Sequence, residues 1–197
     1  MSSKLIYYSQ FKEDKFIVEH ILKSKTNGFF IEIGCAEDGV INSNTKYFED
    51  IGWNGFLIEA DPSAICNIQK HRKAPVLNYA ITNQDHMFID FFVQEDKGYS
   101  GTLRRSGNKI SVKSISLYSL LKNLGCNTHI DLLSIDTEGT ELDVLDGLNN
   151  IRPSIMIVEY NTDLIKNDIK SIWSKLEALN YEIKHQTKCN LVACYRK

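Results

Sequence analysis

Short apolar runs alternate with helix-forming segments along most of the chain, and this alternation limits the possible fold more than any other feature. Five runs rich in Ile, Leu, Val and Phe predict core strands at residues 29–34, 56–60, 75–81, 130–136 and 154–160. The segments between and after them predict helices at residues 42–52, 62–71, 116–125, 139–148 and 163–180. Strands that alternate with helices form right-handed βαβ units around a parallel sheet whose two faces are covered.

The two ends of the chain add to this pattern. Residues 181–186 and 190–196 predict two strands with no helix between them, so one of them must run antiparallel to its neighbour. Near the other end, Ser9 is placed to cap a helix that runs to about Lys25. No repeat or linker divides the chain, and residues 1–197 are predicted to form a single α/β domain with a mostly parallel sheet and an antiparallel C-terminal strand.

The middle of the chain is less regular. Residues 86–93 predict a strand and residues 109–115 a short extended piece. The polar loop between them, 94–108, contains three glycines and is long enough to act as a lid or binding loop.

Composition excludes several classes of protein. The chain has 197 residues and a net charge of −2, without a basic stripe, which argues against nucleic-acid binding. No apolar stretch approaches 18 residues, and the N-terminus lacks the apolar core of a signal peptide, so no membrane span is expected. Five dispersed cysteines without a C-x-x-C pattern favour reduced thiols and a cytoplasmic location.

The turn after the first predicted strand, in the stretch FFIEIGCAEDG (29–39), is suited to a ligand without a phosphate. In its pattern E-x-G-x-x-x-x-G, Gly34 and Gly39 permit positive φ and a close backbone approach. The third glycine of the dinucleotide fingerprint is missing, and Glu37 and Asp38 would repel a pyrophosphate. S-adenosylmethionine carries a sulfonium, an ammonium and a ribose diol but no phosphate, so the turn favours this cofactor.

Glu59 supports the same interpretation. It ends the second predicted strand, about 20 residues after the glycine turn, and the next residue, Ala60, is also expected to contact the cofactor. At this position of a doubly wound sheet, an acid accepts hydrogen bonds from the ribose hydroxyls. The alternative is that Glu59 only caps the helix that begins at Pro62.

Several ordered motifs resemble the FkbM-type methyltransferases, a branch of the class I S-adenosylmethionine-dependent enzymes. The motifs are YSQFKEDKFI (8–17), GFFIEIGCAEDGVINSNTKYFEDIGWNGFLIEADP (28–62), NYAI (78–81), IDLLSIDTEGTELDVLDGL (130–148) and IVEYN (157–161). The resemblance implies a Rossmann-like, seven-stranded, three-layer sandwich and O-methylation of hydroxyls in sugars, polyketides and similar molecules. Cys35 and Ala36 depart from the alanine–asparagine-type pair common in this loop, and the acceptor-binding extension of larger relatives is missing.

The resemblance also implies roles for individual residues. Glu32, Gly34 and Gly39 correspond to the loop on the methionine side of the cofactor, and Glu59 to the acid that holds the ribose. Asn78 and Ala80 fall where the adenine edge is usually read.

The N-terminal segment, residues 1–27, is expected to cover the cofactor side of the sheet. Gln10 would then touch the cofactor; a solvated helix face is the alternative. Asn44 and Thr45 follow the first turn and can cap the next helix, but their N–H groups could also face the methionine carboxylate.

Three carboxylates follow the fourth and fifth core strands: Asp136 and Glu138 in SIDTEG, and Glu159 in VEYN. We expect them to converge, because the carboxyl ends of parallel strands meet at one edge of a sheet. A sugar hydroxyl is a poor nucleophile until its proton is drawn off, so they could supply a general base. Asp136 and Glu159 could instead hold Mg²⁺. For Glu138, and for Glu141 in the same turn, helix capping is the alternative.

The loop between residues 97 and 108 is the candidate for the acceptor side. Tyr99, Ser100 and Arg104 could stack on or hydrogen-bond to a polar acceptor, and Arg104–Arg105 could meet an anionic sugar. A plain solvated loop is the alternative. Of the five histidines, only His185 has a neighbour at ligand spacing, Cys189 across a predicted hairpin turn, and none is expected to be catalytic.

These observations predict an O-methyltransferase for a sugar, glycan or similar small molecule. A protein or nucleic-acid methyltransferase is the nearest competing function, but base-methylating enzymes tend to carry an Asn/Asp-Pro-Pro-aromatic tetrad where this chain reads DTEG. A non-catalytic or partner-dependent domain of a glycan-synthesis system is a second competing function, and a nicotinamide-linked dehydrogenase is a third.

Overall fold

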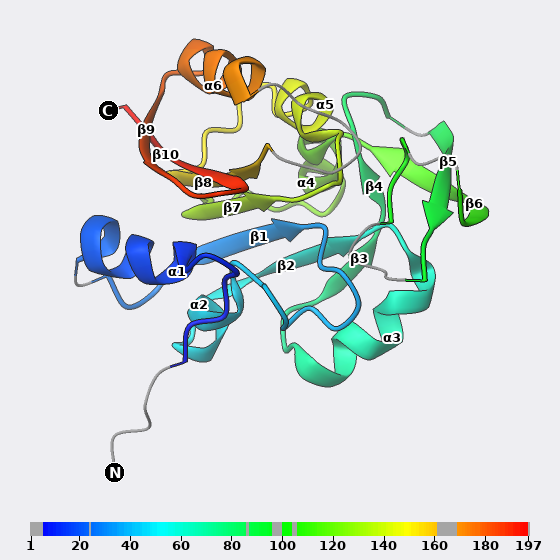
Figure 1. The fold of residues 1–197 in the computed structure, drawn as a ribbon, viewed down its shortest axis with the longest axis horizontal. Helices are drawn as coiled ribbons and strands as arrows, with labels where there is room; N and C mark the ends of the chain where they lie inside the picture. The colour runs from blue at the N-terminus through cyan, green and yellow to red at the C-terminus, as the bar shows by residue number, and fades with distance from the viewer. Residues whose placement is uncertain are drawn as a thin grey trace.

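The core of the computed structural model is a seven-stranded sheet with the order β3-β2-β1-β7-β8-β10-β9 (Figure 1). The structure describes residues 6–23, 25–85, 87–95, 100–103, 106–160 and 169–196. The strands are β1 Phe29–Ile33, β2 Asn54–Glu59, β3 Val76–Asn78, β7 Leu132–Ile135, β8 Ile155–Glu159, β9 Tyr181–Gln186 and β10 Asn190–Tyr195. All neighbours are parallel except β10, which runs antiparallel to both β8 and β9. The predicted mostly parallel sheet with an antiparallel C-terminal strand is confirmed.

Helices cover both faces of this sheet, so the domain has three layers (Figure 1). They are α1 Glu13–Phe16, the π-helix η1 Ile17–Leu22, α2 Lys46–Asp50, α3 Pro62–His71, α4 Leu117–Asn123, α5 Glu141–Asp146 and α6 Ile169–Ala178. One apolar core includes Val144 of α5 and Ile172 of α6, and the other includes Phe48 of α2 and Ile68 of α3. In the described parts of the chain the longest helices have 10 residues, too few to cross a membrane.

Polar side chains fix the starts of three helices close to the predicted positions. The Ser43 hydroxyl accepts the Lys46 N–H at the start of α2 (3.0 Å), and Asp61 accepts the Ser63 N–H in α3 (2.8 Å). Ser116 caps α4 through the Ser119 N–H. Each cap satisfies a backbone donor that has no partner within its own helix.

The N-terminal helix is shorter than predicted. The predicted helix from Ser9 to Lys25 forms only between Glu13 and Leu22, and most of it is the π-helix. The Ser9 hydroxyl accepts the Asp14 N–H, while the Asp14 carboxylate accepts the Ser9 N–H. This reciprocal pair holds residues 9–12 as a turn, because side chains here satisfy donors that a helix would otherwise use.

A second, three-stranded sheet was not predicted. The run 75–81 was expected to be one strand, but β3 ends at Asn78 and β4 (Ala80–Ile81) joins β6 (Asn108–Ile115) and β5 (Met87–Val93) in the order β4-β6-β5. The Asn78 side-chain amide donates to the backbone carbonyls of Glu59 and Ala60, at 2.8 and 2.9 Å. Asn78 therefore ties the end of β3 to the end of β2, and the chain then leaves the main sheet.

Candidate active site

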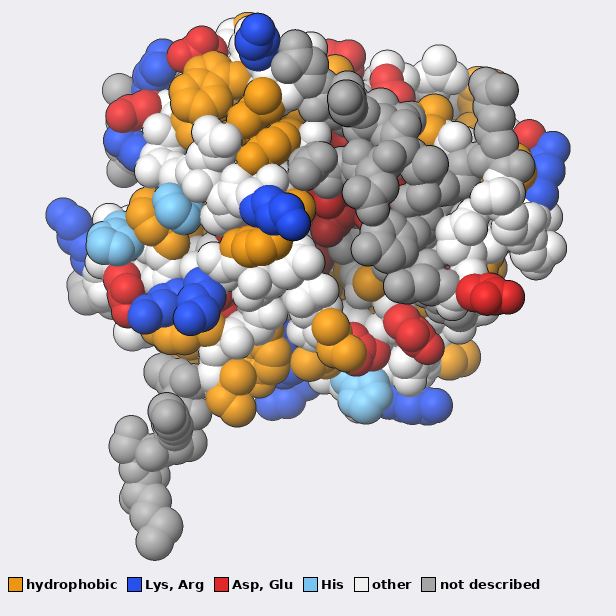
Figure 2. All heavy atoms as spheres, in the orientation of Figure 1, with side chains coloured by type: hydrophobic (Ala, Val, Ile, Leu, Met, Phe, Trp, Pro, Cys, Tyr) orange, Lys and Arg blue, Asp and Glu red, His pale blue; other side chains and the backbone are white. Residues whose placement is uncertain are grey.

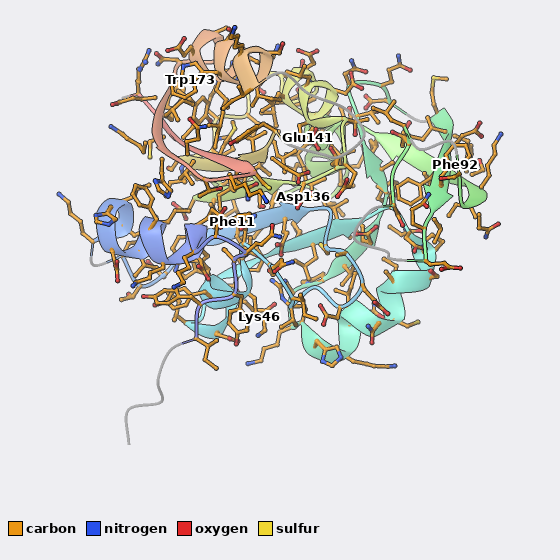
Figure 3. The ribbon with its side chains drawn as sticks, viewed as in Figure 1. Phe11, Lys46, Phe92, Asp136, Glu141 and Trp173 are labelled. Carbon is orange, nitrogen blue, oxygen red and sulfur yellow. The ribbon has the colours of Figure 1, made fainter. Side chains whose placement is uncertain are left out.

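Two hollows meet at the carboxyl ends of β1, β2, β7 and β8. The first, called here the narrow cavity, has about 610 Å³ of space, part of it open to solvent, and is lined by Ile58, Glu59, Ala80 and Phe91 among others. The second, called here the wide cleft, encloses about 1600 Å³ of space that is open to solvent. Four residues line both of them: Gly34, Ala36, Asp136 and Glu138. In Figure 3, Asp136 lies between Phe11 of the N-terminal segment and Glu141 of α5.

The backbone at Gly34 brings the ends of β1, β2 and β7 together. Gly34 has φ +81° and donates its N–H to the Ile58 carbonyl at 2.9 Å. A Cβ atom at this position would lie 1.7 Å from the carbonyl oxygen of Asp136, so only glycine fits. Ala36 and Glu138, which face the same junction, also have positive φ (53° and 56°), a strain that concentrates at functional sites.

Glu32 fixes the shape of the glycine turn through hydrogen bonds and an ion pair. Its carboxylate is 3 % exposed and accepts hydrogen bonds from the Ser43 hydroxyl (2.9 Å), the Thr45 hydroxyl (2.6 Å) and the Asn44 N–H (3.0 Å). The Arg72 guanidinium adds an ion pair at 3.0 Å. These contacts lie within the protein, so Glu32 holds the turn in shape, although Glu32 also contributes to the lining of the wide cleft.

Arg72, at the end of α3, is fully buried and joins this turn to two helices. Its guanidinium binds Glu49 of α2 at 3.2 Å and the Gly39 carbonyl as well as Glu32. Burial alone would lower the pKa of Arg72, but the charges of Glu32 and Glu49 raise it above its usual value. Arg72 was not singled out in the sequence, because a lone arginine near a helix end gives no local signal of its partners.

The structure corrects the expectation for the N–H groups of Asn44 and Thr45. Both point into the protein, to Glu32 and to the Ser43 hydroxyl, and neither is left to meet a ligand. The Asn44 side chain lines the wide cleft instead and is 5 % exposed. Its Nδ2 donates to Ser134, while its Oδ1 is buried without a hydrogen-bond partner among the described residues. Gln10 lines the same cleft from the N-terminal segment.

Glu59 lines the narrow cavity, and its carboxylate is both buried and hydrogen-bonded. Its two oxygens accept the N–H groups of Cys35 (2.9 Å) and Asp61 (2.8 Å), and the residue is 6 % exposed. Burial raises the pKa of Glu59 to about 7, although both hydrogen bonds favour its charged form. The α3 N–H group of Ser63 is capped by Asp61, and Glu59 accepts the N–H of Asp61 itself, so Glu59 also supports the start of α3.

The other expected cofactor residues separate into two groups. Ala60 and Ala80 line the narrow cavity, as does Gly34. Asn78 lines neither hollow, because its amide is turned back to the carbonyls of Glu59 and Ala60. Gly39 is also absent from both linings; its φ of +67° shapes the turn that Arg72 holds.

The three strand-end carboxylates converge as predicted. Carboxylate oxygens of Asp136, Glu138 and Glu159 all lie within 4.8 Å of one another. Asp136 and Glu159 are hydrogen-bonded to each other. Burial raises the pKa of Asp136, and burial together with the charge of Asp136 raises the pKa of Glu159 much further. The pair therefore shares one proton at neutral pH and carries a single negative charge.

Glu141, the first residue of α5, holds the SIDTEG turn in shape, and α5 has no side-chain cap, so the capping alternative is not borne out. The Glu141 carboxylate is fully buried and accepts the N–H groups of Thr137 (2.9 Å) and Gly139 (3.0 Å). Glu138 instead faces both hollows beside Asp136. The three oxygen-rich side chains around the wide cleft are of the type that a hard cation such as Mg²⁺ prefers.

The walls of the wide cleft come from segments that are distant in sequence. Phe11 lines it from the N-terminal segment, and Lys188 and Asn190 from the β9–β10 turn. Buried Glu13 ties these two walls together, since its carboxylate accepts the Phe11 N–H (3.0 Å) and the Asn190 amide (2.8 Å). The motif YSQFKEDKFI contains Phe11 but indicated no role for its side chain, and no motif contains Lys188, because the approach of these two residues depends on the tertiary fold.

The described part of the loop between β5 and β6 lies on the other side. Ser100 and Thr102 line the narrow cavity, not the cleft. Whether Ser100 meets the acceptor depends on which hollow the acceptor enters, so this expectation stays a prediction. Tyr99, Arg104 and Arg105, named with it, lie outside the described residues. Tyr79 also lines the narrow cavity. The sequence did not indicate this, because residues 75–81 were predicted as one strand and the break after Asn78 was not foreseen.

Comparisons with known proteins agree with this geometry. Residues 34–183, more than half of the chain, match the family model of the methyltransferase FkbM domain. No match was found among curated protein sequences.

Similar solved structures include a methyltransferase FkbM from Methylobacillus flagellatus KT, with a TM-score of 0.60 and 10 % identity over 92 % of this chain. This chain spans about half of that protein, 48 % of its length. A precorrin-6y C5,15-methyltransferase from Geobacter metallireducens GS-15 has a TM-score of 0.54 and 12 % identity, over 89 % of this chain and 84 % of that one. A fibrillarin/Nop5p complex also gives 0.54, with 11 % identity over 96 % and 81 %. At these identities the structures show a shared fold. The family match shows more: the chain belongs to the FkbM methyltransferase family, as the resemblance of its motifs predicted.

Proposed function

We propose that the chain is an S-adenosylmethionine-dependent methyltransferase that transfers a methyl group to a hydroxyl of a sugar, glycan or similar small molecule. The observation that carries the proposal is the meeting of the two hollows at Gly34. Glu59 lies on one side of this junction and Glu159 on the other, while Asp136 lines both hollows at the junction itself. A molecule that occupies both hollows would have its middle part at the junction, beside the carboxylates of Asp136 and Glu138.

The two parts of S-adenosylmethionine, adenosine and methionine, suit the two hollows. Its adenosine would occupy the narrow cavity, with the base against apolar side chains such as Phe91 and the ribose hydroxyls on Glu59. Its methionine part would cross Gly34 into the wide cleft, where the unpartnered Oδ1 of Asn44 can receive the ammonium. Gln10 is available to the carboxylate. The acids around the junction would attract the sulfonium, whereas a pyrophosphate would be repelled.

The carboxylates would then serve the transfer. The acceptor hydroxyl gives its proton to Asp136, and its oxygen attacks the methyl carbon in line with the sulfur. The carbon–sulfur bond breaks, its electron pair stays on the sulfur, and the products are a methyl ether and S-adenosylhomocysteine. One proton shared with Glu159 leaves the pair a single negative charge that takes up the hydroxyl proton, and the charge of Glu138 favours the sulfonium at the junction.

Mg²⁺ would act at the same carboxylates. Asp136 and Glu159 are the residues that would hold the ion, and it would supply polarisation of the acceptor hydroxyl. Activity that is lost with EDTA and restored by Mg²⁺ would assign this role to the metal. Activity unchanged by EDTA would leave the proton transfer to Asp136 alone.

Binding of the cofactor product tests the proposal first. S-adenosylhomocysteine should raise the melting temperature of the protein, NAD should not, and Glu59→Gln should reduce the effect. An acceptor screen with labelled S-adenosylmethionine, weighted toward deoxy-sugars and glycosides, then tests turnover. Tight binding without turnover on any acceptor would favour a non-catalytic, partner-dependent domain. The acid-lined cleft argues against nucleic acid as the acceptor, and the five free cysteines fit the cytoplasm.

A further inference from the structure

The start of β10 brings a buried asparagine, Asn190, to the wide cleft. The residue is 7 % exposed and belongs to the lining of the cleft. Its Nδ2 donates to the Glu13 carboxylate at 2.8 Å, while its Oδ1 has no hydrogen-bond partner among the described residues. An acceptor that is removed from water and left without a donor destabilises its site until a ligand supplies one.

Glu13 determines which end of the Asn190 amide faces the cleft. The Glu13 carboxylate is fully buried and accepts the Phe11 N–H (3.0 Å) and the Thr187 hydroxyl (2.9 Å) as well as the Asn190 amide. A carboxylate offers only acceptors, so the donor end of the amide must face Glu13 and its oxygen must face away. The direction of Asn190 Oδ1 is therefore set by the protein itself and does not depend on a bound ligand.

Asn190 lies in line with the carboxylates of the proposed chemistry. It pairs with Glu159 across the β8–β10 ladder, and the next residue, Tyr160, donates its N–H to the Cys189 carbonyl at 2.8 Å. Glu159 and Asn190 are thus a non-hydrogen-bonded antiparallel pair, whose Cα atoms lie about 4.5 Å apart with side chains on one face. Asp136 follows β7 on the other side of β8, so the three residues form a row across neighbouring strands. In Figure 2, acidic side chains are visible near the middle of the face shown, where Figure 3 places Asp136.

Neither the cofactor nor Mg²⁺, as proposed above, uses this oxygen. The methionine part of the cofactor is expected at Asn44 and Gln10. An ion would be held by Asp136 and Glu159, which leaves Asn190 outside its ligand set. The need of Asn190 Oδ1 for a donor is therefore the same with and without a metal ion.

We infer that Asn190 is a specificity-determining residue, which accepts a hydrogen bond from a second hydroxyl of the acceptor beside the one that is methylated. Asp136 and Asn190 are two strand spacings apart, roughly 9–10 Å at the backbone, so one hydroxyl cannot meet both. Two hydroxyls on neighbouring carbons can. The acceptor class is a vicinal diol, as in a sugar ring, and Glu13 is the positioning residue for its recognition. This inference rests on the proposed methyltransferase function and specifies its substrate class.

Acceptors that lack one hydroxyl test the inference. The probes are the methyl glycosides of glucose, mannose and rhamnose and their monodeoxy forms, compared for labelled methyl transfer and for calorimetric binding to the S-adenosylhomocysteine complex. For the glycoside that binds best, loss of one hydroxyl next to the methylated position should lower kcat/KM about five- to tenfold in the wild type. In Asn190→Ala the parent glycoside should fall by the same factor, and the deoxy form should lose nothing further.

Three further variants separate recognition from folding. Glu13→Gln keeps the size of the side chain but can turn a donor toward the Asn190 amide, so it should lose the same hydroxyl discrimination with S-adenosylhomocysteine affinity within about twofold of the wild type. Asn190→Ser keeps a donor for Glu13 and repeats the test if the alanine variant is unstable. Asn83→Ala is the matched control, because Asn83 is exposed outside both linings and also donates its Nδ2 to a carboxylate, that of Asp143 at 3.2 Å. It should keep the wild-type pattern.

The outcomes separate the two proposals. Equal losses for every deoxy form in the wild type, or an unchanged deoxy series in both Asn190 variants, would overturn the role of Asn190. A weaker response to Mg²⁺ in these variants, with hydroxyl discrimination intact, would make Asn190 a metal ligand instead. Failure of the S-adenosylhomocysteine complex to bind any of the glycosides would overturn the vicinal-diol class, whereas failure of the free protein to bind S-adenosylhomocysteine would overturn the methyltransferase proposal.

Discussion

At the scale of single residues, Gly34 shows how narrowly the site is built. The carbonyl of Asp136 occupies the position of a side chain, so the junction of the two hollows exists only because this residue has none. Gly34→Ala should therefore destabilise the fold by several kcal/mol and abolish S-adenosylhomocysteine binding. Gly125 is the matched control: it also has positive φ (64°), but a Cβ there meets nothing within 4 Å.

Urea denaturation and calorimetry would measure these effects. Gly125→Ala should cost about 1 kcal/mol from its left-handed backbone alone, with binding unchanged. Wild-type binding in folded Gly34→Ala would show that the close approach at Gly34 is not needed.

Glu59 gives a prediction about pH. Below about pH 7 the free protein holds a proton on Glu59, because burial raises its pKa to that value. Two ribose donors favour the charged carboxylate and lower its pKa in the complex. Binding should therefore release a proton near pH 6 and tighten roughly tenfold between pH 6 and pH 8.

Calorimetry in buffers of different ionisation enthalpy would detect the released proton. Glu59→Gln should remove the pH dependence. A proton taken up on binding, or the same dependence in Glu59→Gln, would place the ribose elsewhere.

At the scale of elements, Arg72 joins α2, α3 and the turn after β1. Replacing it with methionine would leave buried Glu32 without a cationic partner and Glu49 with Lys46 alone, which should cost about 3–5 kcal/mol of stability. Arg72→Lys keeps the charge but not the two-sided contact, so it should recover part of this loss and still weaken cofactor binding. Equal stability of the wild type and the methionine variant in urea would show that the network is not needed to hold the turn.

The sequence predicted the strands and helices whose signals lie in neighbouring residues. The apolar runs of β1, β2, β7 and β8 and the caps of α3 and α4 follow from neighbouring residues. The break between β3 and β4 was missed because the apolar run continues through it, and the side-chain bonds of Asn78 that separate the strands reach back to Glu59 and Ala60. The short first helix was missed because side-chain hydrogen bonds between Ser9 and Asp14 compete with the helix backbone, and the apolar pattern does not indicate them.

At the scale of the whole molecule, the site also has one part that local sequence predicts and another that depends on the tertiary fold. The Gly34 turn, Glu59 and the strand-end carboxylates were predictable, because parallel strands deliver their ends to one edge. The lining contributed by Phe11 and Lys188 was not, since Glu13 brings these distant segments together only in the folded chain. The glycine turn and the acids are thus properties of the sheet, whereas the acceptor walls are properties of the complete fold.

The most direct test of the central claim uses one substitution at the junction. Asp136→Asn keeps the shape of the side chain but removes the base, so labelled methyl transfer to a glycoside acceptor should fall at least a hundredfold. Binding of S-adenosylhomocysteine should remain within a few-fold of the wild type. Transfer at the wild-type rate in Asp136→Asn would contradict the proposed role of this carboxylate, and wild-type protein that binds no S-adenosylhomocysteine would contradict the account as a whole.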